Sequence, residues 1–184
     1  MKILIQQNSL FSYRLELFNQ LAEIHNVTVF CSESFVDINK VKFNLIVKKN
    51  IKFFKFRFNK KMFYEILNKK YDKIIILPNF YYFSSILAFF FLPKNKRILW
   101  GIDLDRGLIV NKLRLIFAKK ANSIIQYNKR DLSKLLNNNI KRDKIFISNN
   151  TLHVENHMNT SKMNKSSFVY VGRLQARKKI KILF

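Results

Sequence analysis

Short β-branched and aliphatic runs, separated by stretches with a helical pattern, constrain the fold of this chain more than any other feature. Several of these runs are continuously apolar, such as Ile74 to Leu77, which is typical of strands that are buried on both faces of a parallel sheet. We expect eight strands: Lys2–Gln6, Val27–Ser32, Phe43–Val47, Lys73–Leu77, Arg97–Gly101, Ser123–Tyr127, Lys144–Ser148 and Phe168–Gly172. The alternation predicts an α/β fold, an open and mostly parallel sheet with helices on both faces.

Apolar residues at three- and four-residue spacing predict the helices between these strands. Three such stripes are Leu15, Leu17, Phe18, Leu21 and Ala22; Leu113, Ile116, Phe117 and Lys120; and Leu132, Leu135 and Leu136. Ser12 is expected as the N-cap of the first helix. The longest apolar run, Phe80 to Leu92, is shorter than the roughly 20 residues that span a bilayer. It predicts a buried helix, with a helix that dips into a membrane as the alternative.

Charge and cysteine content narrow the class of protein. The chain has 184 residues, with 35 Lys or Arg against 11 Asp or Glu, so its formal charge is +24. Because 48% of the residues are apolar, a folded chain is expected despite this charge. Cys31 is the single cysteine, which excludes a disulfide framework and predicts a small core residue. Only three apolar residues follow Met1-Lys2, so no export signal is expected and the location is predicted to be cytoplasmic.

The segment from Lys40 to Lys73 is strongly basic. It holds 12 Lys or Arg and two acidic residues, with aromatic residues interleaved. Within it, Ile51 to Phe58 is expected to be an extra strand or a surface hairpin. The segment predicts adsorption to an anionic membrane surface, at the inner face of the plasma membrane. A solvated basic face without a membrane role is the alternative.

A candidate phosphate site follows the last expected strand. Gly172 ends that strand, and a basic loop then leads into a helix. Glycine permits close approach of a ligand, and a helix N-terminus favours an anion. Arg173 can bind phosphate oxygens bidentately, and Lys178 can add a point charge. The alternative is a strand end followed by a solvated basic helix.

The composition changes near residue 151. Residues 152–166 are rich in His, Asn, Ser, Thr and Lys, which predicts a linker. We therefore expect a first domain over residues 1–151. Residues 167–184 are expected to be the first strand and the start of the first helix of a second, truncated domain.

Five passages, in order, resemble the family 4 glycosyltransferases of the GT-B fold, of the bacterial cell-surface polysaccharide type. They resemble the family's first helix, its strand and tryptophan-glycine loop, and the passage in which a helix is followed by alanine and aspartate and then by a strand. They also resemble the last strand and hinge of its first domain and the first strand and loop of its second domain. The passages are Phe11–Leu21, Arg97–Arg106, Ala118–Lys129, Asp143–Thr151 and Val169–Ile180.

The resemblance implies a Rossmann-like first domain on the acceptor side and a nucleotide-sugar-binding second domain. It implies transfer of a sugar, of the hexosyltransferase type, from a nucleotide-sugar donor to a cell-surface glycan or lipid-linked acceptor. No cofactor or metal is implied. Gly172, Arg173 and Lys178 would hold the donor diphosphate, where charge develops as the bond breaks. Because most of the second domain is missing, we expect the chain to be inactive alone.

Two departures from the family affect the expected chemistry. Many relatives carry a histidine after the tryptophan-glycine pair, but here Trp100-Gly101 is followed by Ile102-Asp103. Asp103 or Asp105 would face the sugar instead, and Asp103 is the candidate catalytic residue; the alternative is that Asp103 caps or bends the loop. The paired-glutamate motif of the second domain is also absent, because no acidic residue follows Glu155.

Further candidates lie elsewhere in the chain. Tyr13 and Arg14 precede the first helix near the carboxyl end of the first strand, where ligands bind in open α/β sheets. They are expected to contact the acceptor or a donor phosphate. The alternative for Arg14 is a helix-surface cation that packs its stem on the fold.

His153 and His157 have the spacing of metal ligands on a helix, but no helical pattern or third ligand accompanies them, so no metal site is expected.

Two other functions compete with the glycosyltransferase. The charge and the aromatic residues would suit a basic nucleic-acid-binding protein, although no helix-turn-helix, RNA-recognition or zinc-finger signature is present. A non-catalytic peripheral membrane protein is the second competitor.

Overall fold

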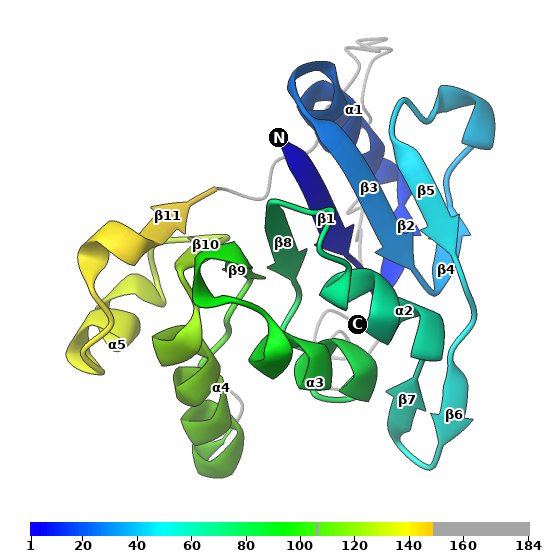
Figure 1. Ribbon diagram of the computed structural model, residues 1–184. Helices are drawn as coiled ribbons and strands as arrows, with labels where there is room; N and C mark the ends of the chain where they lie inside the picture. Colours follow the sequence, from blue (N-terminus) through cyan, green and yellow to red (C-terminus); the bar gives the residue numbers. More distant parts are fainter. Residues whose placement is uncertain (106, 149–184) are drawn as a thin grey trace, which may run out of the picture. The chain divides into compact units, whose positions relative to one another are not determined.

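The structure, a computed structural model, describes residues 1–105 and 107–148 (Figure 1). Its centre is a seven-stranded sheet in the order β11-β10-β9-β8-β1-β3-β5, and every neighbouring pair is parallel. The strands are β1 (Lys2–Gln6), β3 (Asn26–Cys31), β5 (Asn44–Val47), β8 (Lys73–Ile76), β9 (Arg97–Trp100), β10 (Ser123–Gln126) and β11 (Ile145–Ile147). Seven of the eight expected strands are thereby confirmed to within two residues at each end. The eighth, Phe168–Gly172, lies outside the described residues.

The register of the sheet aligns the carboxyl ends of its central strands. Gln6 of β1 is opposite Ile76 of β8, and Ile76 is opposite Leu99 of β9. Leu99 in turn is opposite Ile124 of β10. Because β3 is added on one side of β1 and β8 on the other, the order of the strands reverses between β1 and β8. Ligands of open α/β sheets bind outside the carboxyl ends of the strands at such a reversal.

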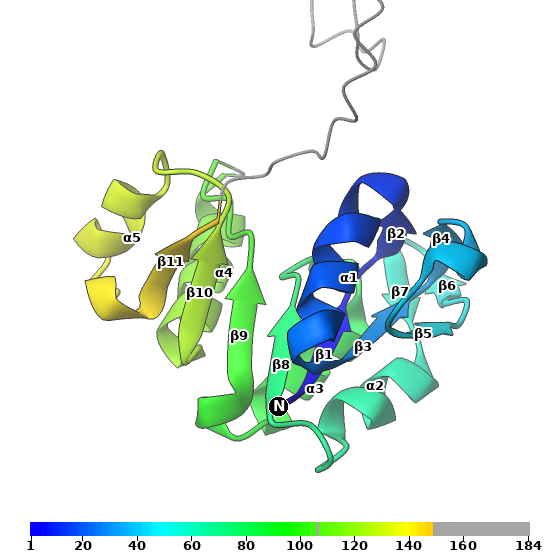
Figure 2. The ribbon, with the colours of Figure 1, turned by 90° about the horizontal axis from the view of Figure 1, so that it is seen from above.

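Helices cover both faces of the sheet, as expected (Figure 2). The helix α1 (Leu15–Ile24) buries Phe18 in a cluster with Ile3 and Ile5 of β1. The other face packs against α2 (Lys60–Leu67), α3 (Phe83–Phe91), α4 (Leu108–Lys120) and α5 (Leu132–Asn137). Leu4, between Ile3 and Ile5, belongs to that second cluster, so the alternation along β1 separates the two cores.

The helix termini and exposed faces correct three expectations. Ser12 is not the N-cap of α1, because Ser12–Arg14 form a 3₁₀ turn and α1 begins after Arg14 without a side-chain cap. The helix α3 is buried on one face only, since Phe91 is 65% exposed. On α4, Phe117 is buried, whereas Leu113 is 42% exposed, so the expected stripe only partly faces the core. No helix in the described part of the chain combines the length and the apolar character needed to cross a bilayer.

Two small sheets lie beside the main one. β2 (Ser9–Phe11) and β4 (Glu33–Phe35) pair in parallel; neither is expected from the sequence. β6 (Ile51–Phe53) and β7 (Phe56–Phe58) form an antiparallel hairpin, which confirms the hairpin expected between Ile51 and Phe58.

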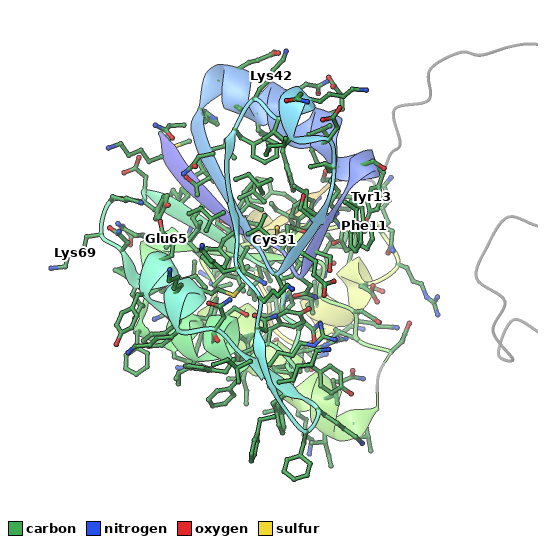
Figure 3. The ribbon with its side chains drawn as sticks, turned by 90° about the vertical axis from the view of Figure 1, so that its right-hand side faces the viewer. Phe11, Tyr13, Cys31, Lys42, Glu65 and Lys69 are labelled. Atoms are coloured by element: carbon green, nitrogen blue, oxygen red, sulfur yellow. The ribbon has the colours of Figure 1, made fainter. Side chains whose placement is uncertain are left out.

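Cys31 lies at the end of β3, inside the molecule (Figure 3). Its side chain is 0% exposed and belongs to the core that contains Phe18, so the expected core role is confirmed. Burial raises the pKa of the thiol from 9.0 to about 11. The neutral thiol is therefore the form that the folded chain favours.

We predict that Cys31 reacts with iodoacetamide at pH 8 at least about a hundred times more slowly in the folded chain than in urea, because only the exposed thiolate is nucleophilic. Relative to Cys31→Ala, the free energy of unfolding should be constant below pH 9 and should fall as the pH rises toward about 11. Mass spectrometry and urea titrations measure the two effects. Equal alkylation rates in buffer and in urea would contradict the buried position.

Candidate functional site

The candidate site lies at the carboxyl edge of the sheet, where residues that follow β2, β9 and β10 meet. The 3₁₀ turn after β2 carries Tyr13 and Arg14. Trp100 is the last residue of β9, and Tyr127 directly follows β10. β9 and β10 are neighbouring parallel strands of the large sheet, so Trp100 and Tyr127 lie at the same edge. The turn after β2, which belongs to a small sheet, is joined to them by the contacts of Arg14.

Arg14 is the centre of this group. Its guanidinium carbon lies 4.5 Å from the centre of the Trp100 ring, 5.4 Å from that of Tyr13 and 6.0 Å from that of Tyr127. Its Nη2 donates a hydrogen bond of 3.2 Å to the Tyr127 hydroxyl, and its Nε donates one of 3.4 Å to the Tyr13 hydroxyl. The side chain is 8% exposed, so Arg14 is a buried cation held by three aromatic rings.

The charge on Arg14 is retained in this setting. Burial alone lowers the pKa of the guanidinium, but the hydrogen bonds to Tyr13 and Tyr127 outweigh it, so the pKa is raised above its ordinary value. No ion pair joins Arg14 to a carboxylate within residues 1–105 and 107–148. A buried cation without an acidic partner attracts anionic groups strongly, because little solvent screens it.

Three buried nitrogen atoms near this edge of the sheet have no hydrogen-bond partner in the described part of the protein. They are Nη1 of Arg14, Nε1 of Trp100 and Nε2 of Gln7. Gln7 directly follows β1, and its side chain is almost fully buried. An unpaired buried donor normally costs about 1–3 kcal/mol, so such groups are rare outside functional sites. A phosphate, carboxylate or sugar hydroxyl supplies the acceptor that such donors require.

Gly101 shapes the site through its backbone. Its φ is +78°, a left-handed conformation that side chains other than glycine rarely adopt. A Cβ at this position would stand 2.3 Å from Cε2 of Tyr127. The absence of a side chain therefore lets the Tyr127 ring lie over the backbone, with its hydroxyl available to Arg14.

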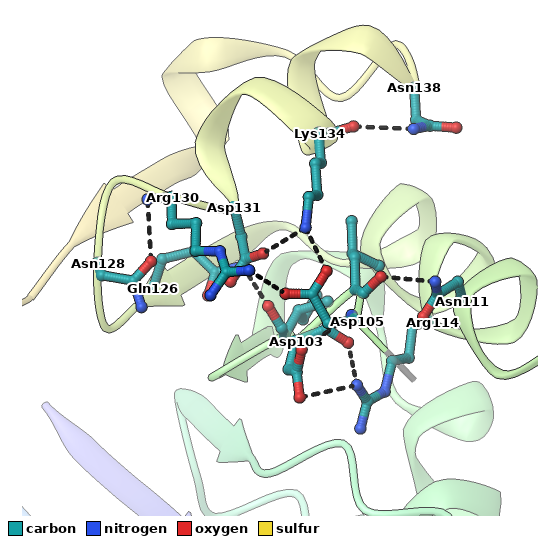
Figure 4. Close-up of polar contacts among 12 residues, drawn as sticks. Asp103, Asp105, Asn111, Arg114, Gln126, Asn128, Arg130, Asp131, Lys134 and Asn138 are labelled. Atoms are coloured by element: carbon teal, nitrogen blue, oxygen red, sulfur yellow. Dashed lines mark hydrogen bonds and ion pairs between the residues drawn. The ribbon is translucent and has the colours of Figure 1, made fainter. Parts of the chain in front are cut away.

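Asp103 lies in the loop that follows Gly101, beside a pocket of about 190 Å³ (Figure 4). One carboxylate oxygen of Asp103 accepts a hydrogen bond of 2.9 Å from the backbone N–H of Asp105. The other lies 3.8 Å from Nη1 of Arg114, which also donates to the Asp103 carbonyl oxygen. The carboxylate thus bends the loop, as in the alternative considered from the sequence. Its side chain is 43% exposed, and its expected catalytic role stays a prediction.

Asp105, Arg130 and Asp131, which also line this pocket, belong to an ion-pair network (Figure 4). Asp105 pairs with Arg130 at 3.3 Å and with Lys134, which also lies 3.7 Å from Asp131. The hydrogen bond to Asp105 raises the pKa of the Lys134 ammonium. Two cations balance Asp105, so its carboxylate ties α5 to the loop after β9.

The structure brings Tyr13 and Arg14 together and places Asp103 in the loop that follows their partner Trp100. The description of Arg14 as a helix-surface cation is wrong, because the residue is buried. Gly172, Arg173 and Lys178 lie outside the described residues, as do His153 and His157, so their expected roles are still predictions. No group of three or more His, Cys, Asp or Glu side chains is arranged to hold a metal within the described ranges.

Sequence reasoning missed Tyr127, Gln7 and Arg114. Tyr127 ends a predicted strand and Gln7 directly follows one, and a position at the carboxyl end of a strand is the signal that could have identified them. Arg114 lies on α4, where nothing in the sequence distinguishes it from the other basic residues.

Comparison with known proteins supports the fold. Two crystal structures of Anabaena Alr3699/HepE resemble the chain. The complex with UDP-glucose has a TM-score of 0.56 and 14% sequence identity, over 83% of this chain and 44% of that one. The complex with UDP and glucose has a TM-score of 0.53 and 15% identity, over 83% and 45% of the two chains. The UDP-GlcNAc 2-epimerase from Methanocaldococcus jannaschii has a TM-score of 0.48 and 17% identity, over 80% and 45%.

The chain therefore spans less than half the length of these solved structures. No protein-family model matches the chain, and no curated protein matches its sequence. At these identities the likeness is one of fold, and the site is defined by the geometry of this chain's own residues.

We predict that Gly101→Ala lowers the free energy of unfolding by about 3 kcal/mol or more, since it combines left-handed backbone strain with overpacking against Tyr127. Gly107→Ala is the matched control: Gly107 has a φ of +97°, but nothing lies within 4 Å of its Cβ position. It should cost about 1–3 kcal/mol, from strain alone. Urea titrations measure both. In a Tyr127→Ala background the two costs should become similar; a Gly101→Ala cost unchanged by that background would contradict the steric account.

Proposed function

We propose that the chain is part of a nucleotide-sugar-dependent enzyme, a glycosyltransferase of the GT-B type. It would transfer a sugar, as a hexosyltransferase, from a nucleotide-diphosphate sugar to a cell-surface glycan or lipid-linked acceptor. The shared fold with a protein crystallised with UDP-glucose and the five sequence passages that resemble family 4 glycosyltransferases support this proposal. Its proposed location is the cytoplasm, at the inner face of the plasma membrane.

One observation carries the proposal: Arg14 and Trp100 present unpaired buried donors at the carboxyl edge of the sheet. A diphosphate satisfies both requirements of this site, because it supplies a negative charge for the guanidinium and oxygen acceptors for the N–H groups. The diphosphate can belong to the nucleotide-sugar donor or to a lipid-linked acceptor. In both substrates it lies next to a sugar.

Each residue of the site has a proposed contact with the substrate. Arg14 would bind a phosphate oxygen through Nη1, which is closed to solvent in this structure and has to be exposed for binding, while the Tyr13 and Tyr127 hydroxyls keep the guanidinium in place. Trp100 would donate its indole N–H to a second oxygen or to a sugar hydroxyl. Asp103 would face the sugar from the adjoining pocket.

A separate set of contacts with a donor diphosphate is proposed for residues 167–184. There Gly172 would allow close approach of the diphosphate, and Arg173 and Lys178 would neutralise its charge as the sugar–phosphate bond breaks. Two cations acting in this way can replace a metal ion, and we propose that the reaction uses none.

Binding measurements test the proposal. Isothermal titration of the full 184-residue chain with pyrophosphate, UDP and UDP-glucose should show saturable binding. Arg14→Lys should weaken the tightest complex about 10- to 150-fold, because a charge-assisted hydrogen bond is worth about 1.5–3 kcal/mol. The substitution keeps the formal charge at +24, so non-specific attraction is unchanged. UDP-glucose binding tighter than pyrophosphate would assign the site to the donor, and the reverse order would assign it to the acceptor's diphosphate.

Arg57→Lys is the matched control. Arg57 donates a hydrogen bond of 2.6 Å to the Tyr82 hydroxyl and lies 5.2 Å from the centre of that ring, so it resembles Arg14 in its contacts. It belongs to β7, outside the site, and its substitution should leave every affinity unchanged. Equal affinities for the folded Arg14→Lys variant and the native chain, with all three ligands, would refute the proposed role of this site.

A further inference from the structure

The hairpin formed by β6 and β7 exposes aromatic residues that no other described part of the chain covers. Figure 1 shows it projecting away from the seven-stranded sheet. Phe53 is 70% exposed, Phe56 is 52% exposed, and Phe54 at the turn is 90% exposed. Single exposed apolar residues are normal on a protein surface. Several exposed aromatic rings on one small element indicate an interaction surface.

The rings gather on one face of the hairpin. Ile51 lies opposite Phe58, and Phe53 lies opposite Phe56, so these four side chains share a face. Together with Phe83 of α3, the phenylalanines of that face line a pocket of about 280 Å³. We call Phe53, Phe54, Phe56, Phe58 and Phe83 the aromatic tip.

The hairpin is fixed firmly to the domain. The backbone N–H of Arg57 donates to the Tyr81 carbonyl oxygen at 2.7 Å, and its guanidinium donates to the Tyr82 hydroxyl. At the base, Asn59 is buried, caps α2 by accepting from the N–H of Met62, and donates to the Lys48 carbonyl oxygen at 2.8 Å. These hydrogen bonds attach the hairpin to the neighbouring segments and hold the aromatic tip at the surface.

Positive charge surrounds the aromatic tip. Between Asp37 and Glu65 the chain has no acidic residue. The exposed lysines on the hairpin and beside it are Lys48, Lys49, Lys52, Lys55, Lys60 and Lys61. Lys52 lies opposite Arg57 on the other face of the hairpin, so the paired strands carry rings on one face and cations on the other, while Lys55 lies in the turn beside Phe54. Segregation fits a bilayer, in which rings enter the interface while lysines contact phosphates. Binding to single-stranded nucleic acid requires rings and cations along one groove.

We propose that the aromatic tip inserts into the interface of an anionic lipid bilayer and that the surrounding lysines bind its headgroups. A second copy of the chain is disfavoured as the occupant, because two tips would bring like charges together without an acidic partner. The inference deepens the membrane location given under the proposed function by naming the surface that makes the contact; that surface is built from other residues than the Arg14 site, so the two can be tested separately.

Vesicle binding tests the inference with the full 184-residue chain. Flotation with vesicles of phosphatidylglycerol and phosphatidylethanolamine should recover the native chain, and neutral phosphatidylcholine vesicles should not. Phe53→Ser/Phe54→Ser should weaken binding to the anionic vesicles at least tenfold, and more at 0.3 M than at 0.05 M salt. The matched control is Phe35→Ser/Phe146→Ser, two phenylalanines that are 60% and 56% exposed on other elements. Their loss should leave vesicle binding unchanged.

Insertion itself has a separate readout. Phe54→Cys places a reactive thiol at the turn, while buried Cys31 stays unlabelled. An environment-sensitive fluorophore on that thiol should shift to the blue with anionic vesicles and should be quenched by brominated lipid.

Three results would overturn the inference: equal weakening by the Phe35/Phe146 control, an unshifted fluorophore on vesicles that bind the chain, or a blue shift with an oligothymidine strand but not with vesicles. The last result would assign the surface to nucleic acid. UDP-glucose binding by the folded hairpin variants should equal that of the native chain, so a failure at the Arg14 site and a failure here are distinguishable.

Discussion

A charged guanidinium is buried against the indole of the only tryptophan in the chain, and the loops at the carboxyl edge of the sheet are arranged around that contact. Arg14 joins the turn after β2 to the end of β9 and, through the Tyr127 hydroxyl, to the end of β10. Tyr127 can take this place because Gly101 has no side chain. Since no carboxylate in the described part of the chain pairs with Arg14, the contact orients the cation without neutralising it. An oriented, weakly screened cation is what an anionic substrate requires.

The distribution of charge separates two kinds of surface on one domain. At the sheet edge, a cation is buried among rings and keeps unpaired donors. At the hairpin, rings are exposed and the cations surround them. The first arrangement suits a small anionic ligand, because burial strengthens each polar contact. The second suits an extended anionic surface, because many exposed lysines and a projecting apolar tip act together without a defined pocket. A glycosyltransferase with a lipid-linked acceptor would need both.

Much of the fold could be predicted from the sequence, because parallel strands buried on both faces leave continuous apolar runs. The run from Ile74 to Leu77 identified β8, and the same signal identified the other strands of the large sheet. The pair β2 and β4 was missed, since neither Ser9–Phe11 nor Glu33–Phe35 contains a continuous apolar run. Ser12 was misassigned as a cap because a 3₁₀ turn intervenes before α1.

The site was predictable only in part. The position of Arg14 after the first strand indicated a ligand contact, and the structure adds that the side chain is buried. Contacts such as Arg14 to Tyr127 join residues 113 positions apart, and no local pattern encodes them. Binding of an anionic ligand by Arg14 and Trp100 is tested most directly through the indole N–H of Trp100. It gives a single resonance, which can be followed in a ¹H–¹⁵N NMR titration of the chain with UDP-glucose and pyrophosphate. The account predicts a saturable downfield shift that is lost in Arg14→Lys. A signal that stays in place at ligand concentrations that saturate the native chain would contradict it.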